Sequence, residues 1–157
     1  MRKKIIGVIG GRTCNKEVEQ IAQKIGELIA NVGAILVCGG FGGVMEAACK
    51  GAKAVKGETL GIISTYNKDN ANKYCDIVIP TGLGLARNVL VVQTADIIIA
   101  LPGQYGTLSE IAYALQFSKP VISFESWDIK GVLKVKNIIE VENKLKELFK
   151  KWRPGFY

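Results

Sequence analysis

The chain has 157 residues, of which 48% are hydrophobic and 22% charged, a balance that predicts one globular domain over residues 1–157 and argues against extended disorder. Its net charge of +7 favours anionic partners such as phosphates, nucleotides or nucleic acid, although Lys side chains spread along a chain are also typical of a solvated surface. The absence of His excludes Ser-His-Asp and Cys-His nucleophile systems and His-ligated metal sites.

Short, almost continuously apolar runs alternate with helical patterns along the chain. The first run follows a basic N-terminus but is interrupted by Gly10-Gly11-Arg12, so it reads as a strand rather than a signal peptide. None of the runs is long enough to cross a bilayer, and we expect a cytoplasmic protein. In chain order, the predicted strands are Ile5–Ile9, Ala34–Cys38, Thr59–Ile63, Ile77–Ile79, Ile97–Leu101 and Val121–Ser123.

Five helices are predicted between and after these strands from apolar residues at helical spacing. They cover about Val18–Val32, Val44–Val55, Leu85–Thr94, Thr107–Gln116 and Val141–Lys151. Strands without polar alternation are typical of a parallel sheet that is buried on both faces. The order of elements therefore predicts an α/β fold: a doubly wound, mainly parallel Rossmann-like sheet with helices on both faces.

Glycine-rich loops follow four of the predicted strands, at residues 10–15, 39–43, 81–88 and 102–107. Ligands of such folds bind beyond the carboxyl ends of the strands, where glycines and helix N-termini let an anion approach the backbone closely. One such loop alone would favour a simple tight turn, whereas four favour phosphate binding. The spacing is not G-x-G-x-x-G, and no Gly-Lys-Ser/Thr sequence marks a Walker-type loop.

The fourth loop, Pro102-Gly103-Gln104-Tyr105-Gly106-Thr107, continues into Leu108-Ser109-Glu110. Thr107 and Glu110 have the spacing of a capping box, in which Thr107 caps a helix and Glu110 bonds back to the cap. The same geometry would place Thr107 and the first-turn amides on a phosphate or ribose, with the Glu110 carboxylate nearby. The two roles are compatible.

Together with Gly39-Gly40-Phe41-Gly42-Gly43-Val44-Met45-Glu46-Ala47-Ala48, this loop resembles the Lonely-guy superfamily. That superfamily carries a Pro-Gly-Gly-x-Gly-Thr-x-x-Glu motif after a Gly-Gly-rich loop, and the resemblance covers about residues 5–121. It includes cytokinin riboside 5′-monophosphate phosphoribohydrolases, proteins labelled as lysine decarboxylases, molybdenum-cofactor carriers and, more distantly, DNA processing protein A. The resemblance implies a homodimer or larger homo-oligomer, which an apolar stretch at Val89–Val92 supports indirectly.

By this resemblance, Arg87 and Glu110 correspond to catalytic residues, and the activity implied is hydrolysis of the N-glycosidic bond of a nucleoside 5′-monophosphate. Glu110 would stabilise oxocarbenium character or activate water, and Arg87 would hold phosphate or stabilise developing charge. The residues assigned to ligand binding are Gly11, Arg12, Gly39, Gly40, Gly42, Gly43, Met45, Gly82, Asn88, Pro102, Gly103, Tyr105, Gly106 and Thr107.

Two departures from the hydrolase pattern favour a second hypothesis, a carrier without turnover. Gln104 replaces the second Gly of the motif, and Asn88 stands where the hydrolases carry Lys. The stretch that contains Arg87 and Asn88 is more similar to the molybdenum-cofactor carriers. Both hypotheses require no cofactor, and the ligand is a nucleoside monophosphate in one and a phosphorylated pterin in the other.

Two further activities receive less support. No Lys lies in a recognisable Schiff-base motif, which argues against lysine decarboxylation. Nucleic-acid binding would need basic residues interleaved with aromatics, and only Trp152 and Phe156 lie near a basic cluster.

The four cysteines, Cys14, Cys38, Cys49 and Cys75, form no CxxC pair, so we expect buried thiols and no metal site. Cys14 and Cys38 both follow predicted strands, which leaves open whether they approach each other.

Overall fold

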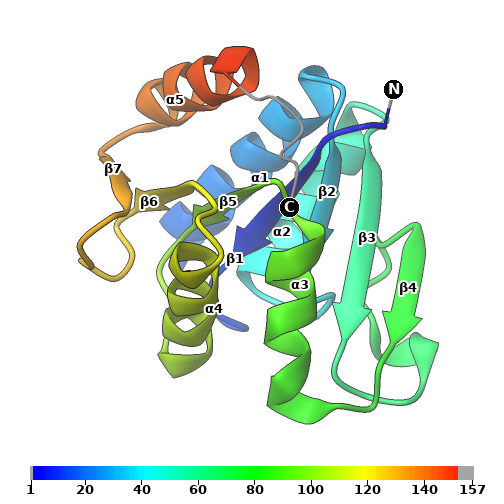
Figure 1. Ribbon diagram of the computed structural model, residues 1–157. Coiled ribbons are helices and arrows are strands. Elements are labelled where there is room, and N and C mark those ends of the chain that lie inside the picture. Colours follow the sequence, from blue (N-terminus) through cyan, green and yellow to red (C-terminus); the bar gives the residue numbers. More distant parts are fainter. Residues whose placement is uncertain (1, 152–157) are drawn as a thin grey trace.

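Seven parallel strands form one sheet at the centre of the computed structural model, which describes residues 2–151 (Figure 1). Their order across the sheet is β4-β3-β2-β1-β5-β6-β7, and every neighbouring pair is parallel. The strands are β1 (Ile5–Ile9), β2 (Ile35–Cys38), β3 (Glu58–Ile63), β4 (Ile77–Pro80), β5 (Ile97–Ala100), β6 (Val121–Phe124) and β7 (Leu133–Val135).

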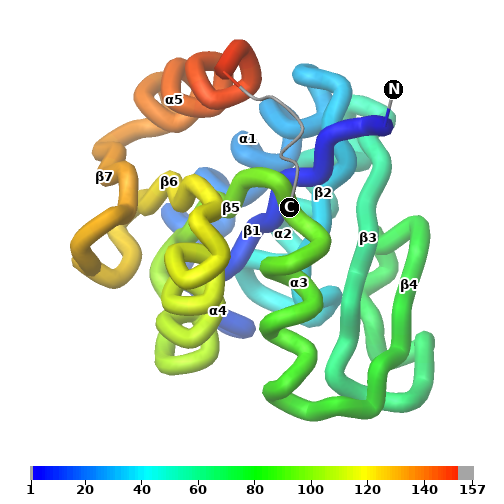
Figure 2. Tube along the Cα trace, viewed as in Figure 1, coloured from blue at the N-terminus to red at the C-terminus, as the bar shows by residue number. Residues whose placement is uncertain are grey.

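Helices cover both faces of the sheet, as the tube in Figure 2 makes clear. One face packs against α1 (Lys16–Asn31), α2 (Val44–Ala54) and α5 (Ile138–Lys151), and the other against α3 (Asn88–Thr94) and α4 (Tyr105–Gln116). Successive strand residues serve opposite cores, since Leu36 joins the first and Val37 the second. The predicted doubly wound α/β fold is confirmed.

The first two helices pack so closely that glycines are required between them. A Cβ on Gly26 of α1 would lie 1.9 Å from the carbonyl oxygen of Ala48, and one on Gly51 of α2 would lie 1.9 Å from that of Gln23. Asn15 fixes the start of α1 by accepting a 2.9 Å hydrogen bond from the amide of Val18. These contacts hold the loop that follows β1 against the loop that precedes α2.

The order of the strands reverses next to β1, which pairs with β2 on one side and β5 on the other. At this point the loops after β1 and β5 are joined, because the Gly11 amide donates to the Pro102 carbonyl at 2.9 Å. The Val44 amide, at the start of α2, donates in turn to the Gly11 carbonyl at 3.0 Å. The ends of three strands therefore meet at the position where doubly wound folds bind ligands.

Several sequence expectations differ from the structure. The predicted capping box is wrong: α4 begins at Tyr105 after an N-cap at Gln104, so Thr107 and Glu110 lie inside the helix. A 3-10 helix (Gly84–Arg87) precedes α3, another covers Lys68–Asn70, and β7 was not predicted. Val91 and Val92 are fully buried, so they belong to the core and give no support for oligomerisation.

Within residues 2–151, no helix has the length and apolar character needed to span a membrane.

Candidate functional site

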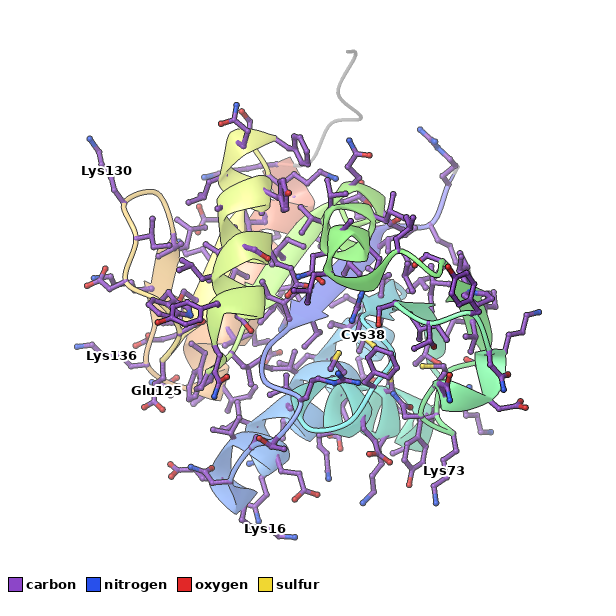
Figure 3. The ribbon with its side chains drawn as sticks, turned by 90° about the horizontal axis from the view of Figure 1, so that it is seen from below. Lys16, Cys38, Lys73, Glu125, Lys130 and Lys136 are labelled. Atoms are coloured by element: carbon purple, nitrogen blue, oxygen red, sulfur yellow. The ribbon has the colours of Figure 1, made fainter. Side chains whose placement is uncertain are left out.

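A cleft of about 690 Å³ opens at the carboxyl edge of the sheet, where the three loops meet. The strand arrowheads point downward in Figure 1, so Figure 3, seen from below, looks onto this edge, with Cys38 near the centre and labelled lysines at the rim. The lining residues are Gly10, Gly11, Arg12, Thr13, Met45, Ser64, Gly84, Leu85, Arg87, Asn88, Pro102, Gly103, Gln104, Gly106, Thr107 and Glu110.

Arg87 lies at the base of this cleft and is only 7% exposed. Its Nη1 donates to the carbonyl of Ile62 at 3.0 Å, while its Nε is buried without a partner. Gly39 makes room for it, because a Cβ there would lie 2.0 Å from Nη1. Burial lowers the pKa of Arg87 from its usual value, but a guanidinium keeps its charge in proteins. The cleft therefore contains a fixed cation with a donor to spare.

A second guanidinium, that of Arg12, lies beside the same aromatic ring, Phe41. Arg12 lies 4.2 Å from the centre of the Phe41 ring and Arg87 lies 5.4 Å from it. Arg12 also lines a smaller neighbouring depression of about 440 Å³ that includes Glu46. Among the described residues, neither guanidinium forms a salt bridge. Two cations held this close favour an anion between them.

Glu110 is the carboxyl group of the cleft and is 7% exposed. Burial raises its pKa to about 8, although the positive charge of Arg87 acts in the opposite direction. At neutral pH the group is therefore mainly protonated and does not cancel the charges of Arg87 and Arg12. A neutral carboxyl here can donate a proton or a hydrogen bond, which is the state that a general acid needs.

The N-terminus of α4 forms one wall of the cleft. Gln104 provides no side-chain cap to the helix, so its first amides are available to an anion. The hydroxyl of buried Thr107 packs over Gly103, where a Cβ would lie 2.0 Å from the oxygen. The Trp127 indole N–H donates to the carbonyls of Gly103 and Gln104 at 3.1 and 3.2 Å, which fixes this loop from outside.

Asn88, at the start of α3, connects the two helices of this face. Its amide nitrogen donates to Ser109 Oγ at 3.1 Å and lies 3.5 Å from the carbonyl oxygen of Gly106. These contacts hold the residue that precedes it, Arg87, against α4. Asn88 therefore lines the cleft while also supporting its geometry.

Ten of the sixteen residues predicted for the site line the cleft, namely Gly11, Arg12, Met45, Arg87, Asn88, Pro102, Gly103, Gly106, Thr107 and Glu110. The others shape it from behind or beside it. Gly39 backs Arg87, Gly43 lies against the backbone of Arg12, and Gly82 lies under the Tyr66 ring. Gly40 packs on Ile63, Gly42 approaches the Arg12 carbonyl, and Tyr105 is exposed and stacks on Trp127.

Six residues that line the cleft were not assigned to the site, and all of them except Ser64 lie within the predicted glycine-rich loops: Gly10, Thr13, Ser64, Gly84, Leu85 and Gln104. Ser64 directly follows β3, so its place at a strand end was the available signal, but the loop there lacks the glycines that identified the other four. Trp152 and Phe156, the aromatic residues weighed for nucleic-acid binding, lie outside the described residues.

The cysteines are arranged differently from the pairing that the sequence left open. Cys38 lies 3.5 Å from Cys49, sulfur to sulfur, and Cys14 instead lines the depression beside Arg12. All four are free thiols.

Known proteins of similar sequence identify the family of this chain. Residues 3–153 match the model of the SLOG cluster4 family. The chain belongs to this family. Its relatives include an uncharacterized protein of Archaeoglobus fulgidus, 49% identical over 76% of this chain and 79% of the relative. They also include a cytokinin riboside 5′-monophosphate phosphoribohydrolase of Mycobacterium tuberculosis, 30% identical over 71% of this chain and 64% of that protein. The predicted superfamily placement is confirmed.

Solved structures of the same fold cover nearly the whole chain. The molybdenum cofactor binding protein of Rippkaea orientalis superposes with a TM-score of 0.86 at 37% identity, covering 95% of this chain and 99% of that one. The Moco carrier protein of Chlamydomonas reinhardtii superposes with a TM-score of 0.87 at 32% identity, covering 96% of this chain and 100% of that one. DNA processing protein A of Helicobacter pylori superposes with a TM-score of 0.72 at 21% identity, covering 96% of this chain and 82% of that one. This similarity shows a shared fold alone.

Proposed function

We propose that this protein binds a small phosphorylated, nucleotide-like ligand in the cleft and holds it by its phosphate. The observation that carries the proposal is the pair of guanidinium groups, Arg12 and Arg87, both beside the Phe41 ring and without a salt-bridge partner among the described residues. A phosphate accepts hydrogen bonds from both and from the amides at the start of α4. Protonated Glu110 adds a donor instead of a repelling charge.

Carriage without turnover is the use that we favour for this site. The similarity to two molybdenum cofactor binding proteins extends over nearly the whole chain, whereas the similarity to the phosphoribohydrolase is lower and covers less of it. The ligand in that case is a phosphorylated pterin, whose terminal phosphate matches the donors described above.

Hydrolysis of a nucleoside 5′-monophosphate is the second candidate, and the state of Glu110 supports it. A buried carboxyl with a pKa of about 8 could protonate a departing base, and the neighbouring Arg87 would then stabilise the phosphate end of the substrate. In this reaction, water supplies the hydroxyl that replaces the base at the ribose carbon, and the products are a free base and ribose 5-phosphate.

Calorimetric titration with AMP, GMP and their unphosphorylated nucleosides tests the binding proposal. We expect the monophosphates to bind and the nucleosides to bind at least about tenfold more weakly, roughly 1.4 kcal/mol. Arg12→Gln should weaken the binding of the monophosphates by a similar factor, because it removes one of the two guanidinium groups. The variant should fold normally, since Arg12 is exposed. Lys16→Gln removes a charge from the same side of the molecule and is the control. Equal affinity for nucleosides and monophosphates would contradict the proposal.

The same samples separate carriage from hydrolysis. Free base is measured by chromatography after incubation with each monophosphate, using the wild type and Glu110→Gln. Release by the wild type alone would establish the hydrolase and Glu110 as its acid. Binding without release favours the carrier, and native mass spectrometry of the purified protein would then identify a retained pterin.

A further inference from the structure

Three of the four cysteines meet beneath the glycine-rich loop at residues 39–43, outside the cleft lining. Cys38 is the last residue of β2, Cys49 lies on α2, and Cys75 lies two residues before the start of β4. Their sulfur atoms all lie within 4.8 Å of one another, and Cys38 and Cys49 are 3.5 Å apart. Cys38 and Cys49 are fully buried, whereas Cys75 is partly exposed and gives access from solvent. Figure 3 places Cys38 in the interior, among the sulfur atoms drawn in yellow.

The surrounding backbone holds these three thiols in position. The Gly40 amide donates to the Cys38 sulfur at 3.3 Å, a contact that also suits a thiolate. Gly61 leaves the space for the third sulfur, because a Cβ there would lie 2.8 Å from Cys75 Sγ. Asn72 ties the segment before Cys75 to the loop, since its amide donates to the Gly40 carbonyl at 2.8 Å. These contacts therefore fix the relative positions of the three sulfur atoms.

The spacing fits one metal ion at the centre of the three sulfurs. Three sulfur ligands in a plane around one metal ion, each at a metal–sulfur distance of about 2.3 Å, lie about 4.0 Å from one another. The sulfur–sulfur separations here include this value, since the Cys38–Cys49 separation is 3.5 Å and all three sulfurs lie within 4.8 Å of one another. Structural zinc sites use four ligands. No fourth Cys, His, Asp or Glu joins the cluster in residues 2–151. Three soft ligands without a fourth select a soft monovalent ion.

We propose that Cys38, Cys49 and Cys75 form a binding site for Cu(I). The metal keeps its oxidation state, and each thiol that becomes a ligand releases its proton to solvent. The site is separate from the proposed phosphate cleft and does not depend on the proposed function. It lies against the same loop, however, because Gly39, which backs Arg87, is next to Cys38 in the chain.

Titration with Cu(I) under anaerobic conditions, against a colorimetric Cu(I) chelator, tests this site. The protein is first reduced, and its four thiols are counted, so that a disulfide cannot imitate an absence of binding. We expect the wild type to retain an equimolar amount of Cu(I) and to gain a thiolate-to-copper absorption band. Zn(II) should not be retained against a chelator of matched strength, because the fourth ligand is missing.

Two cysteine variants locate the site. Cys75→Ser, at the partly exposed position, should fold and lose retention of Cu(I), together with the rise in thermal unfolding temperature that Cu(I) gives the wild type. Cys14→Ser is the matched control and should behave like the wild type. The proposal is overturned if fully reduced wild type does not retain Cu(I), if Cys75→Ser retains it equally, or if Cys14→Ser loses it.

Discussion

Glu110 shows how one buried side chain can connect ligand chemistry with stability. It lies inside α4, 7% exposed, and its pKa is raised to about 8 by burial against the opposing effect of Arg87. Its ordinary pKa is 4.5. Between these values the folded protein keeps a proton that the unfolded chain has released, so the free energy of unfolding falls as the pH rises from about 5 to 8.

Glu110→Gln should remove this fall, because glutamine is neutral at every pH. Between pH 5 and pH 8, we expect the free energy of unfolding of the variant to rise by about 1 to 3 kcal/mol relative to that of the wild type. Urea denaturation at each pH measures this difference. Glu17→Gln, which changes an exposed carboxyl on α1, should leave the dependence on pH unchanged. Parallel curves for the wild type and Glu110→Gln would show that the carboxyl is already ionised at neutral pH.

For individual residues, the sequence predicted which side chains lie in the cleft better than it predicted their local backbone geometry. Arg87 and Glu110 were selected by resemblance, and both lie in the cleft. The capping interpretation failed because the spacing of Thr107 and Glu110 suits a helix start, but the backbone has already entered α4 at Tyr105. The burial that raises the pKa of Glu110 depends on contacts between distant segments, which no local pattern contains.

Among the elements, α1 and α2 form the tightest contact, and it depends on glycine. Gly26→Ala would place a methyl group 1.9 Å from the Ala48 carbonyl oxygen, so the helices must separate. Although alanine favours helix by about 1 kcal/mol, overpacking costs more, and we expect a net loss of about 1 to 3 kcal/mol in the free energy of unfolding. Lys24→Ala, on the exposed side of α1, should change stability little. A neutral Gly26→Ala would show that the helices adjust freely.

The α-helices and six of the seven strands of residues 2–151 were predictable, whereas β7 and the two 3-10 helices were not. The first strand was placed at its observed bounds, Ile5–Ile9, because four β-branched residues around Gly7 lie between a basic stretch and Gly10, a run with few alternatives. β7 has only three residues, Leu133–Val135, and no pattern that separates it from a loop. The predicted helix at Leu85–Thr94 merges the 3-10 turn at Gly84–Arg87 with α3, since both present apolar residues at similar spacing.

At the scale of the whole molecule, an exposed apolar surface lies along edge strand β4. Ile77 is 61% exposed, Ile79 is 44% exposed, and Leu85 nearby in the chain is 81% exposed. An edge strand with exposed apolar side chains favours association. This surface replaces Val89–Val92 as the structural basis for expecting a homo-oligomer, an expectation that came from family resemblance.

The double variant Ile77→Lys/Ile79→Lys should therefore shift an oligomer toward monomer, measured by size-exclusion chromatography with light scattering over a range of concentrations. Lysine at these positions would place like charges against each other at the contact. Ile139→Lys, at a position on α5 that is 64% exposed, is the control and should not change the mass. A wild type that is monomeric at every concentration would remove this surface as an interface.

The pairing of β1 with β5 has a consequence for how the protein is made. Ile6 pairs with Ile97, so the seam beneath the cleft joins two segments that leave the ribosome far apart in time. The half of the sheet from β1 to β4 is synthesised first, and it lacks the β5 loop and the wall formed by α4. A growing chain therefore cannot present the complete cleft until residue 110 has emerged, so a phosphorylated ligand can stabilise only the later stages of folding.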